Sequence, residues 1–468
     1  MDTIKIAEYG NHFADFDGAV INRIRSAFMK NRIVETKKGK IAGISQGGCV
    51  FFKGIPYAKP PVGELRWKPP AETEPWEDTF EADTFPNRCM QLPQSNEFYL
   101  KEFYQNADFE VNTSEDCLYL NIWVPENAKE EKLPVAVYIH GGAFLGGHCS
   151  ELEFDGAGYC KRDVILVSIN YRCNVFGFLA HPWLSAESEC GISGNYGILD
   201  QIAALKWIQE NIGAFGGDAE NITIFGQSAG SMSVQTLVSS ELTQGLIHKA
   251  ILQSAGSYGG GLNKDVFLQE AMEKGEKIAE AAGVKTAEEL RSLSSEAALA
   301  LVEKSFELFS MSEGLTFIPN IDGYVLKDGY DKLVDEDKIH KISYMIGSTE
   351  NDLTCLEEDI AKGIKSSLYH GCISWSLKNE ENGNVPSYVY YFKRKLPGDD
   401  AGAFHSAELW YIFETLKRCW RPMTKHDYAL AEKMITCWAN FMKNGNPNGQ
   451  ENEWRLCTKE DSFVMEFE

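Results

Sequence analysis

The chain has 468 residues, of which 44% are hydrophobic and 12% aromatic, so it holds enough apolar material for a large buried core. Its formal net charge of −23 argues against nucleic acid and anionic membrane surfaces as partners, because both are bound by basic patches. No run approaches the roughly 18 apolar residues of a membrane helix, and residues 1–32 lack the apolar segment of a secretory signal. We therefore expect a cytoplasmic protein with no membrane partner.

Apolar runs and helical patterns alternate along the chain, with no internal repeat or long linker. This alternation favours an α/β fold in which a mostly parallel central sheet carries helices on both faces. We expect residues 1–31 to form a surface extension, with an amphipathic helix at 19–29, and residues 32–468 to form a single catalytic domain. A helical insertion is expected at about 259–341. Strands are expected at 133–139, 164–169, 222–225, 250–252, 342–346 and 388–392, and helices at 200–212, 231–238, 265–282 and 294–309.

A glycine-containing loop, residues 140–144 (His-Gly-Gly-Ala-Phe), directly follows the strand expected at 133–139. Glycines in such a loop let the backbone approach a reacting carbonyl group without side chains in the way. Loops of this type supply backbone N–H groups to an oxyanion hole. We expect the N–H groups of Gly142 and Ala143, together with that of Ala229, to point at the developing oxyanion. The alternative is a glycine-rich turn that binds no ligand.

The pattern G-x-S-x-G occurs at residues 226–230 (Gly-Gln-Ser-Ala-Gly), between the strand expected at 222–225 and the helix expected at 231–238. A strand, a tight turn and a helix in this order form a nucleophile elbow, which exposes the serine hydroxyl on a strained turn. The flanking glycines are needed because a Cβ at either position would collide with the neighbouring strand or helix. The sequence therefore predicts that Ser228 is a nucleophile; the alternative is a serine in an ordinary β-to-α turn.

The serine motif lies in a longer segment, residues 215–230, that resembles the active-site signature of the type-B carboxylesterases. These are the cholinesterase-like branch of the α/β-hydrolase superfamily. Residues 115–125 are similar to a second signature of that family, and the resemblance extends from about residue 32 to the C-terminus. It implies an α/β-hydrolase fold and a catalytic triad in the chain order serine, acid, histidine. Shorter similar stretches are 54–58, 170–172, 194–197 and 445–449.

Three histidines, His370, His405 and His426, lie far enough downstream of Ser228 to follow an acid in that order. His405 stands in a loop just after the strand expected at 388–392, and this loop resembles the catalytic-histidine loop of the family. The other two fit ordinary surface positions. We expect His405 to be the general base that takes the proton of Ser228 and returns it to the leaving group.

The triad acid is expected in the segment that follows the strand at 342–346. The family usually places a glutamate five residues after the glycine that ends this strand, here Gly347, and that position holds Asp352. Glu350 lies two residues earlier and stays open as the alternative. Either carboxylate could fix the imidazole tautomer and stabilise the imidazolium. Matching by position favours Asp352.

These residues predict a serine hydrolase of carboxylic esters that works through a Ser-His-Asp triad and an acyl-enzyme. The expected substrates are small-molecule carboxylic esters over a broad apolar range, and no cofactor or metal is expected. Gln227 precedes the nucleophile where cholinesterases carry an acidic residue, which weighs against choline esters. The alternatives are an amidase or thioesterase with the same triad, and a non-catalytic cholinesterase-like binding module. The oligomeric state stays open.

Two further expectations concern the cysteines and the entrance to the site. Cys89 and Cys117 match a pair that forms a loop disulfide in secreted relatives, but without an export signal we expect all twelve cysteines to be reduced. No zinc-like C-x-x-C spacing occurs. Residues 353–404, between the expected acid and base, form a shorter segment than relatives usually carry. We expect a wider, shallower gorge that tolerates bulky acyl or alcohol groups.

Overall fold

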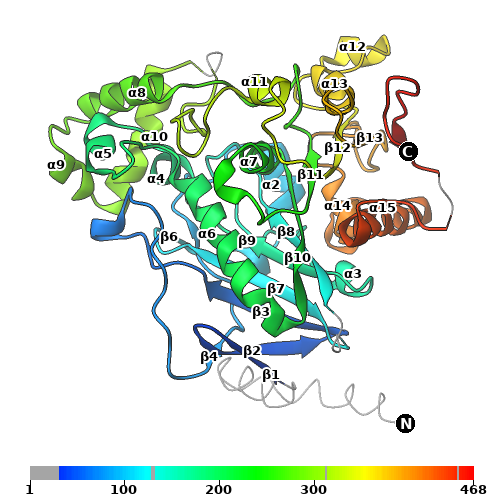
Figure 1. Ribbon diagram of the computed structural model, residues 1–468, viewed down its shortest axis with the longest axis horizontal. Coiled ribbons are helices and arrows are strands. Elements are labelled where there is room, and N and C mark those ends of the chain that lie inside the picture. Colours follow the sequence, from blue (N-terminus) through cyan, green and yellow to red (C-terminus); the bar gives the residue numbers. More distant parts are fainter. Residues whose placement is uncertain (1–30, 128–131, 311–313, 451–452) are drawn as a thin grey trace.

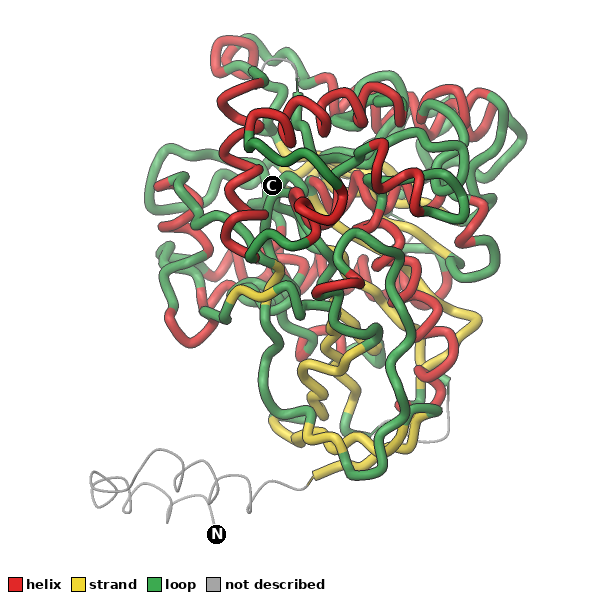
Figure 2. The backbone as a smooth tube through the Cα atoms, turned by 90° about the vertical axis from the view of Figure 1, so that its left-hand side faces the viewer, coloured by secondary structure: helices red, strands yellow, loops and turns green. Residues whose placement is uncertain are grey.

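The computed structural model describes residues 31–127, 132–310, 314–450 and 453–468. The expected surface extension and its helix at 19–29 lie outside the described residues, except for residue 31, which begins the first strand. A twelve-stranded sheet forms the centre of the fold, and in Figure 2 its strands run from the lower end of the molecule up between the helices. The strands follow the order β1 (Asn31–Thr36), β2 (Gly39–Gln46), β3 (Cys49–Pro56), β7 (Tyr119–Pro125), β9 (Ile165–Ile169), β8 (Leu133–Ile139), β10 (Gly217–Gln227), β11 (Lys249–Gln253), β12 (Ser343–Thr349), β13 (Tyr388–Phe392) and β14 (Met465–Phe467), and β4 (Phe80–Glu81) pairs with β2.

The sheet is parallel over most of its width and antiparallel at its N-terminal edge. From β9 through β8 to β14, each strand runs parallel to the next. The pairs from β1 to β9 run antiparallel. This confirms the expected mostly parallel sheet. Because parallel strands end at the same edge, the loops that follow β8, β10, β12 and β13 emerge together. A separate pair is formed by β5 (Arg88–Cys89) and β6 (Thr113–Ser114).

Alternating side chains of β8 face two separate apolar cores, one on each face of the sheet. Val135, Val137 and Ile139 belong to the core shared with helices α6 and α7. Ala136 and Tyr138 belong to the core shared with α15. A strand that is buried on both faces reads as a continuous apolar run, and this is why residues 133–139 could be recognised from the sequence.

Helices cover both faces of the sheet, as expected from the alternating pattern (Figure 1). Helices α6, α7 and α13 pack on one face, and α3 and α15 pack on the other, with α14 against α15. The helices are α2 (Glu97–Phe103), α3 (Ala157–Cys160), α4 (Asn174–Phe178), α5 (Pro182–Glu187), α6 (Tyr196–Asn211), α7 (Ala229–Val238), α8 (Leu268–Ala281), α9 (Ala287–Arg291), α10 (Ser295–Leu308), α11 (Tyr330–Asp335), α12 (Glu357–Ala361), α13 (Ser367–Glu381), α14 (Leu409–Ile412) and α15 (Lys425–Asn444).

The bounds of several expected elements differ from the structure by a few residues. The strands at 133–139 and 388–392 have the bounds predicted for them. Strand β12 continues three residues beyond the prediction, to Thr349, because Gly347, Ser348 and Thr349 pair with β13. Helix α6 begins at Tyr196, four residues before the prediction. The residues that pair with the end of a strand can be distant in the sequence, so they leave no local pattern. The ends of elements are therefore the hardest features to predict.

The expected insertion at 259–341 contains helices α8 to α11, and Figure 1 shows α8, α9 and α10 grouped beside α4 and α5. The side chain of Arg66 joins this group to the N-terminal part of the chain, because it donates hydrogen bonds to the carbonyl oxygens of Arg291 and Leu293 at 2.9 and 2.6 Å. The same guanidinium forms a buried ion pair with Glu115. These contacts join the insertion to the N-terminal part of the described chain, and a single domain over residues 32–468 stays a prediction.

All twelve cysteines are free thiols in the structure, and Cys89 and Cys117 are both buried. The Cys89 sulfur accepts the backbone N–H of Cys173 at 3.3 Å. Among the described residues, no group of three or more His, Cys, Asp or Glu side chains is arranged to hold a metal ion. The described helices include none that is long and apolar enough to cross a membrane.

Candidate active site

Ser228 occupies the turn between β10 and α7 in a strained backbone conformation, with φ +57° and ψ −127°. Its N–H donates to the carbonyl oxygen of Gln253 on β11 at 3.0 Å, and its own carbonyl accepts the N–H of Met232 at 2.9 Å. These two bonds hold a conformation that a residue with a side chain rarely adopts. Ser228 is half-buried, whereas Gln227 and Ala229 on either side of it are buried. The turn therefore has the shape expected of a nucleophile elbow.

The two glycines of the motif allow helix α7 to start close against the sheet. A Cβ on Gly230 would lie 2.0 Å from the carbonyl oxygen of Ile139, the last residue of β8. A Cβ on Gly226 would lie 2.6 Å from the backbone of Gly230. Neither collision involves a flexible side chain, so only glycine fits at these two positions.

The loop after β8 lies directly beside the nucleophile. A Cβ on Gly141 would be only 3.2 Å from the Cβ of Ser228. Gly142, Ala143 and Phe144 then adopt φ values of +103°, +56° and +57° in succession, which turns the backbone sharply. No other described residue accepts the N–H of Gly142 or Ala143. Ala229 is the first residue of α7, where an N–H has no partner within the helix. Ala229 thus adjoins Ser228, and the loop that carries Gly142 and Ala143 begins beside it.

His405 and Asp352 form a short hydrogen bond, with Nδ1 of the imidazole 2.6 Å from Oδ1 of the carboxylate. The two residues are 6% and 2% exposed, so water screens their interaction little. Glu350, the alternative acid, is half-buried, and its backbone N–H bonds to the carbonyl oxygen of Phe392. Of the two carboxylates considered from the sequence, Asp352 is therefore the one in contact with the imidazole.

Asn351 joins the loop of Asp352 to the loop of His405, and no pattern in the sequence pointed to this role. Its N–H donates to the carbonyl oxygen of Ala403 at 3.0 Å, and its Oδ1 accepts the N–H of Ala403 at 2.9 Å. A Cβ on Gly402 would lie 2.4 Å from this Oδ1, so the two loops are in close contact. The carboxylate of Asp352 is also fixed by the N–H groups of Thr349 and Leu353.

The two buried carboxyl groups at the site have opposite pKa shifts. Burial raises the pKa of Asp352, but the charge and hydrogen bond of His405 and the N–H of Thr349 outweigh it, so the pKa lies below its usual value. Glu408 is fully buried, and burial together with the nearby charge of Asp352 raises its pKa to about 7. Environments that shift the pKa values of two carboxyl groups in opposite directions are typical of catalytic sites.

The other ring nitrogen of His405 contacts Gln227. Nε2 of the imidazole lies 3.1 Å from the side-chain nitrogen of Gln227, and the hydroxyl of Ser406 donates to Oε1 of the same amide at 2.9 Å. No hydrogen bond joins the Ser228 hydroxyl to His405 in the described part of the chain. The sequence drew attention to Gln227 only as a non-acidic residue; its position against the imidazole is a result of folding.

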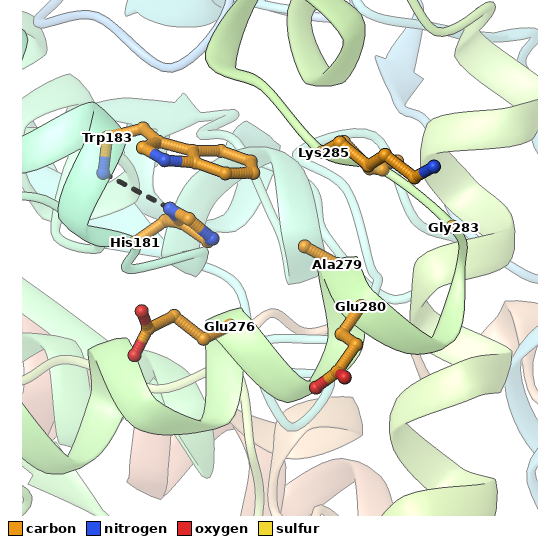
Figure 3. Close-up of a pocket in the computed structure, with 8 residues that line it drawn as sticks. His181, Trp183, Glu276, Ala279, Glu280, Gly283 and Lys285 are labelled. Atoms are coloured by element: carbon orange, nitrogen blue, oxygen red, sulfur yellow. Dashed lines mark hydrogen bonds between the residues drawn. The ribbon is translucent and has the colours of Figure 1, made fainter.

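A pocket of about 470 Å³ lies elsewhere, between α5 and α8 (Figure 3). The backbone N–H of Trp183 donates to Nδ1 of His181 there, and burial lowers the pKa of His181 to about 4. None of the predicted site residues lines this pocket, so it is separate from the elbow. Its lining consists of His181, Trp183, Glu276, Ala279, Glu280, Gly283, Val284 and Lys285.

A mostly parallel sheet flanked by helices, with a nucleophile elbow after one of its strands, defines an α/β-hydrolase. A model of the carboxylesterase family matches residues 30–370 and 364–468. The chain is 31% identical over 487 residues to the para-nitrobenzyl esterase of Bacillus subtilis, a match that covers 94% of this chain and 96% of that protein. The chain belongs to the carboxylesterase family.

Two further comparisons agree with this assignment. The medium-chain fatty acyl-CoA hydrolase precursor of Anas platyrhynchos is 32% identical over 477 residues, covering 85% of this chain and 81% of that protein. The solved structure of a thermophilic PNB esterase is 29% identical and superposes with a TM-score of 0.82, covering 94% of this chain and 96% of the other.

Replacing Gly230 with alanine tests the close packing of α7 on β8. We expect Gly230→Ala to lower the free energy of unfolding by about 3 kcal/mol, because the added methyl group meets a backbone carbonyl that has no room to move. Gly213→Ala is the control, since a Cβ at Gly213 meets nothing within 4 Å, and its effect should stay within about 0.5 kcal/mol. Urea unfolding of both variants measures the difference, and equal stabilities would contradict the packing argument.

Proposed function

We propose that the protein is a serine hydrolase of carboxylic esters with Ser228 as nucleophile, His405 as general base and Asp352 as the acid that orients the base. The observation that carries the proposal is the 2.6 Å bond between His405 and Asp352 at the same sheet edge as the strained turn of Ser228. A serine is a weak nucleophile without such a base, and a base needs a partner that fixes its tautomer. The carboxylesterase relatives support the same chemistry.

The mechanism follows from the positions of these groups. An ester enters with its carbonyl oxygen toward the N–H groups of Gly142, Ala143 and Ala229, which stabilise the developing oxyanion. Ser228 attacks, and Nε2 of His405 takes its proton and then passes it to the departing alcohol. This leaves an acyl-enzyme. Water activated by His405 attacks the acyl group, releases the carboxylic acid and returns the serine.

Aromatic side chains next to the histidine loop support apolar substrates. On α2, the ring of Phe98 lies edge-on to the ring of Phe404, with 4.9 Å between centroids. The hydroxyl of the neighbouring Tyr99 contacts the carbonyl oxygen of His405 at 3.4 Å. Leu353, directly after the acid, is 60% exposed. We propose that these apolar groups favour esters with bulky apolar acyl or alcohol parts, because ligand sites are mostly lined by such side chains.

Thioester hydrolysis is the second candidate. The observation that favours it is the similarity to a protein named as a fatty acyl-CoA hydrolase, at 32% identity over most of both chains. A thioester places its carbonyl oxygen and acyl carbon like an ester, so the same nucleophile and oxyanion donors would serve both reactions.

Removing the nucleophile tests the proposed function. We expect Ser228→Ala to lower ester turnover by a factor of roughly 10⁴ or more, because the acyl-enzyme can no longer form. The fold should be unaffected, since the bonds to Gln253 and Met232 that hold this turn run through the backbone N–H and C=O of residue 228, which alanine keeps. Steady-state hydrolysis of p-nitrophenyl butyrate, with circular dichroism as the folding control, measures both. Unchanged turnover would end the proposal.

The two carboxylates near β12 provide a matched test of the acid. We expect Asp352→Asn to lower kcat by roughly 1,000- to 10,000-fold, because an amide favours the wrong imidazole tautomer and cannot stabilise the imidazolium. Glu350→Gln removes a carboxylate two residues away that does not touch the imidazole, and kcat should stay close to the wild-type value. Comparing kcat of the two purified variants decides between the carboxylates, and the reverse order would make Glu350 the acid.

A panel of matched substrates tests the breadth of the site. We expect hydrolysis of p-nitrophenyl esters from acetate to octanoate and of bulky aryl esters, because apolar side chains surround the histidine loop. A matched thioester should also be cleaved, and a matched anilide more slowly, since its amine leaving group needs protonation. Initial rates give kcat/KM for each compound. Turnover confined to the acetate would contradict a roomy apolar site.

A further inference from the structure

The residue before the nucleophile, Gln227, touches the nitrogen that must take the serine proton. Its side-chain nitrogen is 3.1 Å from Nε2 of His405, and only 3% of Gln227 is exposed to solvent. The contact joins the end of β10 to the histidine loop, 178 positions later in the chain. Gln227 neither gives nor takes a proton in the proposed mechanism, yet its amide lies against the nitrogen of His405 that does both.

The hydrogen bond at Nδ1 of His405 determines which group donates in the contact at Nε2. Nδ1–H of His405 donates a hydrogen bond to the carboxylate of Asp352, so in the neutral ring Nε2 carries a lone pair and accepts. The amide N–H of Gln227 is the donor to that lone pair. The hydroxyl of Ser406 donates to Oε1 of the amide at 2.9 Å and so holds the amide in this orientation. The backbone of Ser406 has a φ of +82°, which is uncommon for a residue with a side chain. Such strained positions are often found at functional sites, and this one carries the hydroxyl that bonds to Gln227.

We propose that Gln227 is a positioning residue that holds Nε2 of the neutral His405 in the free enzyme and gives it up to Ser228 when substrate binds. The inference rests on the proposed function, because it assigns a role relative to the proposed base. The Ser228 hydroxyl and the Gln227 amide are both donors, and they compete for one lone pair. The neutral ring is the form that can act as a base.

An amide at this position serves both protonation states of the ring. When His405 carries the serine proton, Nε2–H needs an acceptor, and a half-turn of the Gln227 amide brings Oε1 to it. The NH₂ group then donates to the hydroxyl of Ser406, which can accept as readily as it donates. A carboxylate in place of the amide could only accept a hydrogen bond. It would bind Nε2–H of the protonated ring, but it would be repelled by the lone pair on Nε2 of the neutral ring.

The charged and polar groups around the imidazole determine how large this effect is. Asp352 faces the ring from the loop after β12, and Glu408 contributes a buried carboxyl group three residues after His405. Tyr99 of α2 contacts the carbonyl oxygen of His405 at 3.4 Å. A third carboxyl group at position 227 would thus join two others already beside the ring, and would favour the imidazolium further.

The pH dependence of Gln227→Glu tests the proposal. We expect the acidic limb of kcat/KM to move to higher pH by about one unit or more, because the carboxylate favours the protonated ring. Gln244→Glu is the matched control: Gln244 is exposed after the short turn that follows α7, and the same charge change there should leave the limb in place. A limb that does not move in Gln227→Glu, or that moves equally in Gln244→Glu, overturns the proposal.

A second variant and a direct measurement keep the test independent of folding and of turnover. Ser406→Ala leaves Gln227 in place but removes the hydroxyl that orients its amide, and should move the limb in the same direction by a smaller amount. The ring resonance of His405, identified by its loss in His405→Gln, can be titrated by NMR in each protein. If Ser228→Ala hydrolyses esters as fast as the wild type, the proposed function fails. If the titration midpoint of the His405 ring resonance is the same in Gln227→Glu as in the wild type, the role of Gln227 is refuted.

Discussion

The contact between the first turn of α7 and the end of β8 is the constraint on which the site depends. Gly226 pairs with Ile139 in the parallel ladder of β10 and β8, and a Cβ on Gly230 would meet the carbonyl oxygen of Ile139 at 2.0 Å. The chain continues from Ile139 directly into the loop of Gly142. One backbone contact therefore sets both the strained turn of Ser228 and the distance between this turn and the loop of the proposed oxyanion donors, with no adjustable side chain between them.

Asp352 and His405, the proposed acid and base, reach this edge of the sheet through the register of two other parallel strands. Residues at the ends of β12 and β13 pair in register. The loops that follow them are joined by Asn351, whose backbone N–H donates to the carbonyl oxygen of Ala403 and whose side-chain Oδ1 accepts the N–H of Ala403. Parallel strands bring their carboxyl ends to one edge of a sheet, and this explains why loops far apart in the sequence meet there. The bond between His405 and Asp352 is a consequence of that arrangement.

Charge inside the site differs sharply from charge over the whole molecule. The chain carries a net charge of −23, yet the site holds Asp352 ionised only because the imidazole and backbone N–H groups compensate its burial. Glu408, close to that charge, has a pKa raised to about 7. A neutral amide at Gln227 adds polarity to this edge without a further negative charge. The net charge of this site thus depends on which of its side chains are neutral as well as on which are charged.

Local features of this protein could be recognised from the order of its residues. The elbow at Ser228 is a contiguous strand, turn and helix, and β8 is buried on both faces, so a pattern of adjacent residues was enough to recognise each of them. Family resemblance led to His405 and Asp352, and the structure brings the two into contact. Other partners in the site, among them Gln227 and Asn351, became visible in the folded chain alone, because each makes its contact with a residue that is distant in the sequence. Such a contact exists only after the sheet has set the register of its strands, and no periodicity or spacing within the chain records it.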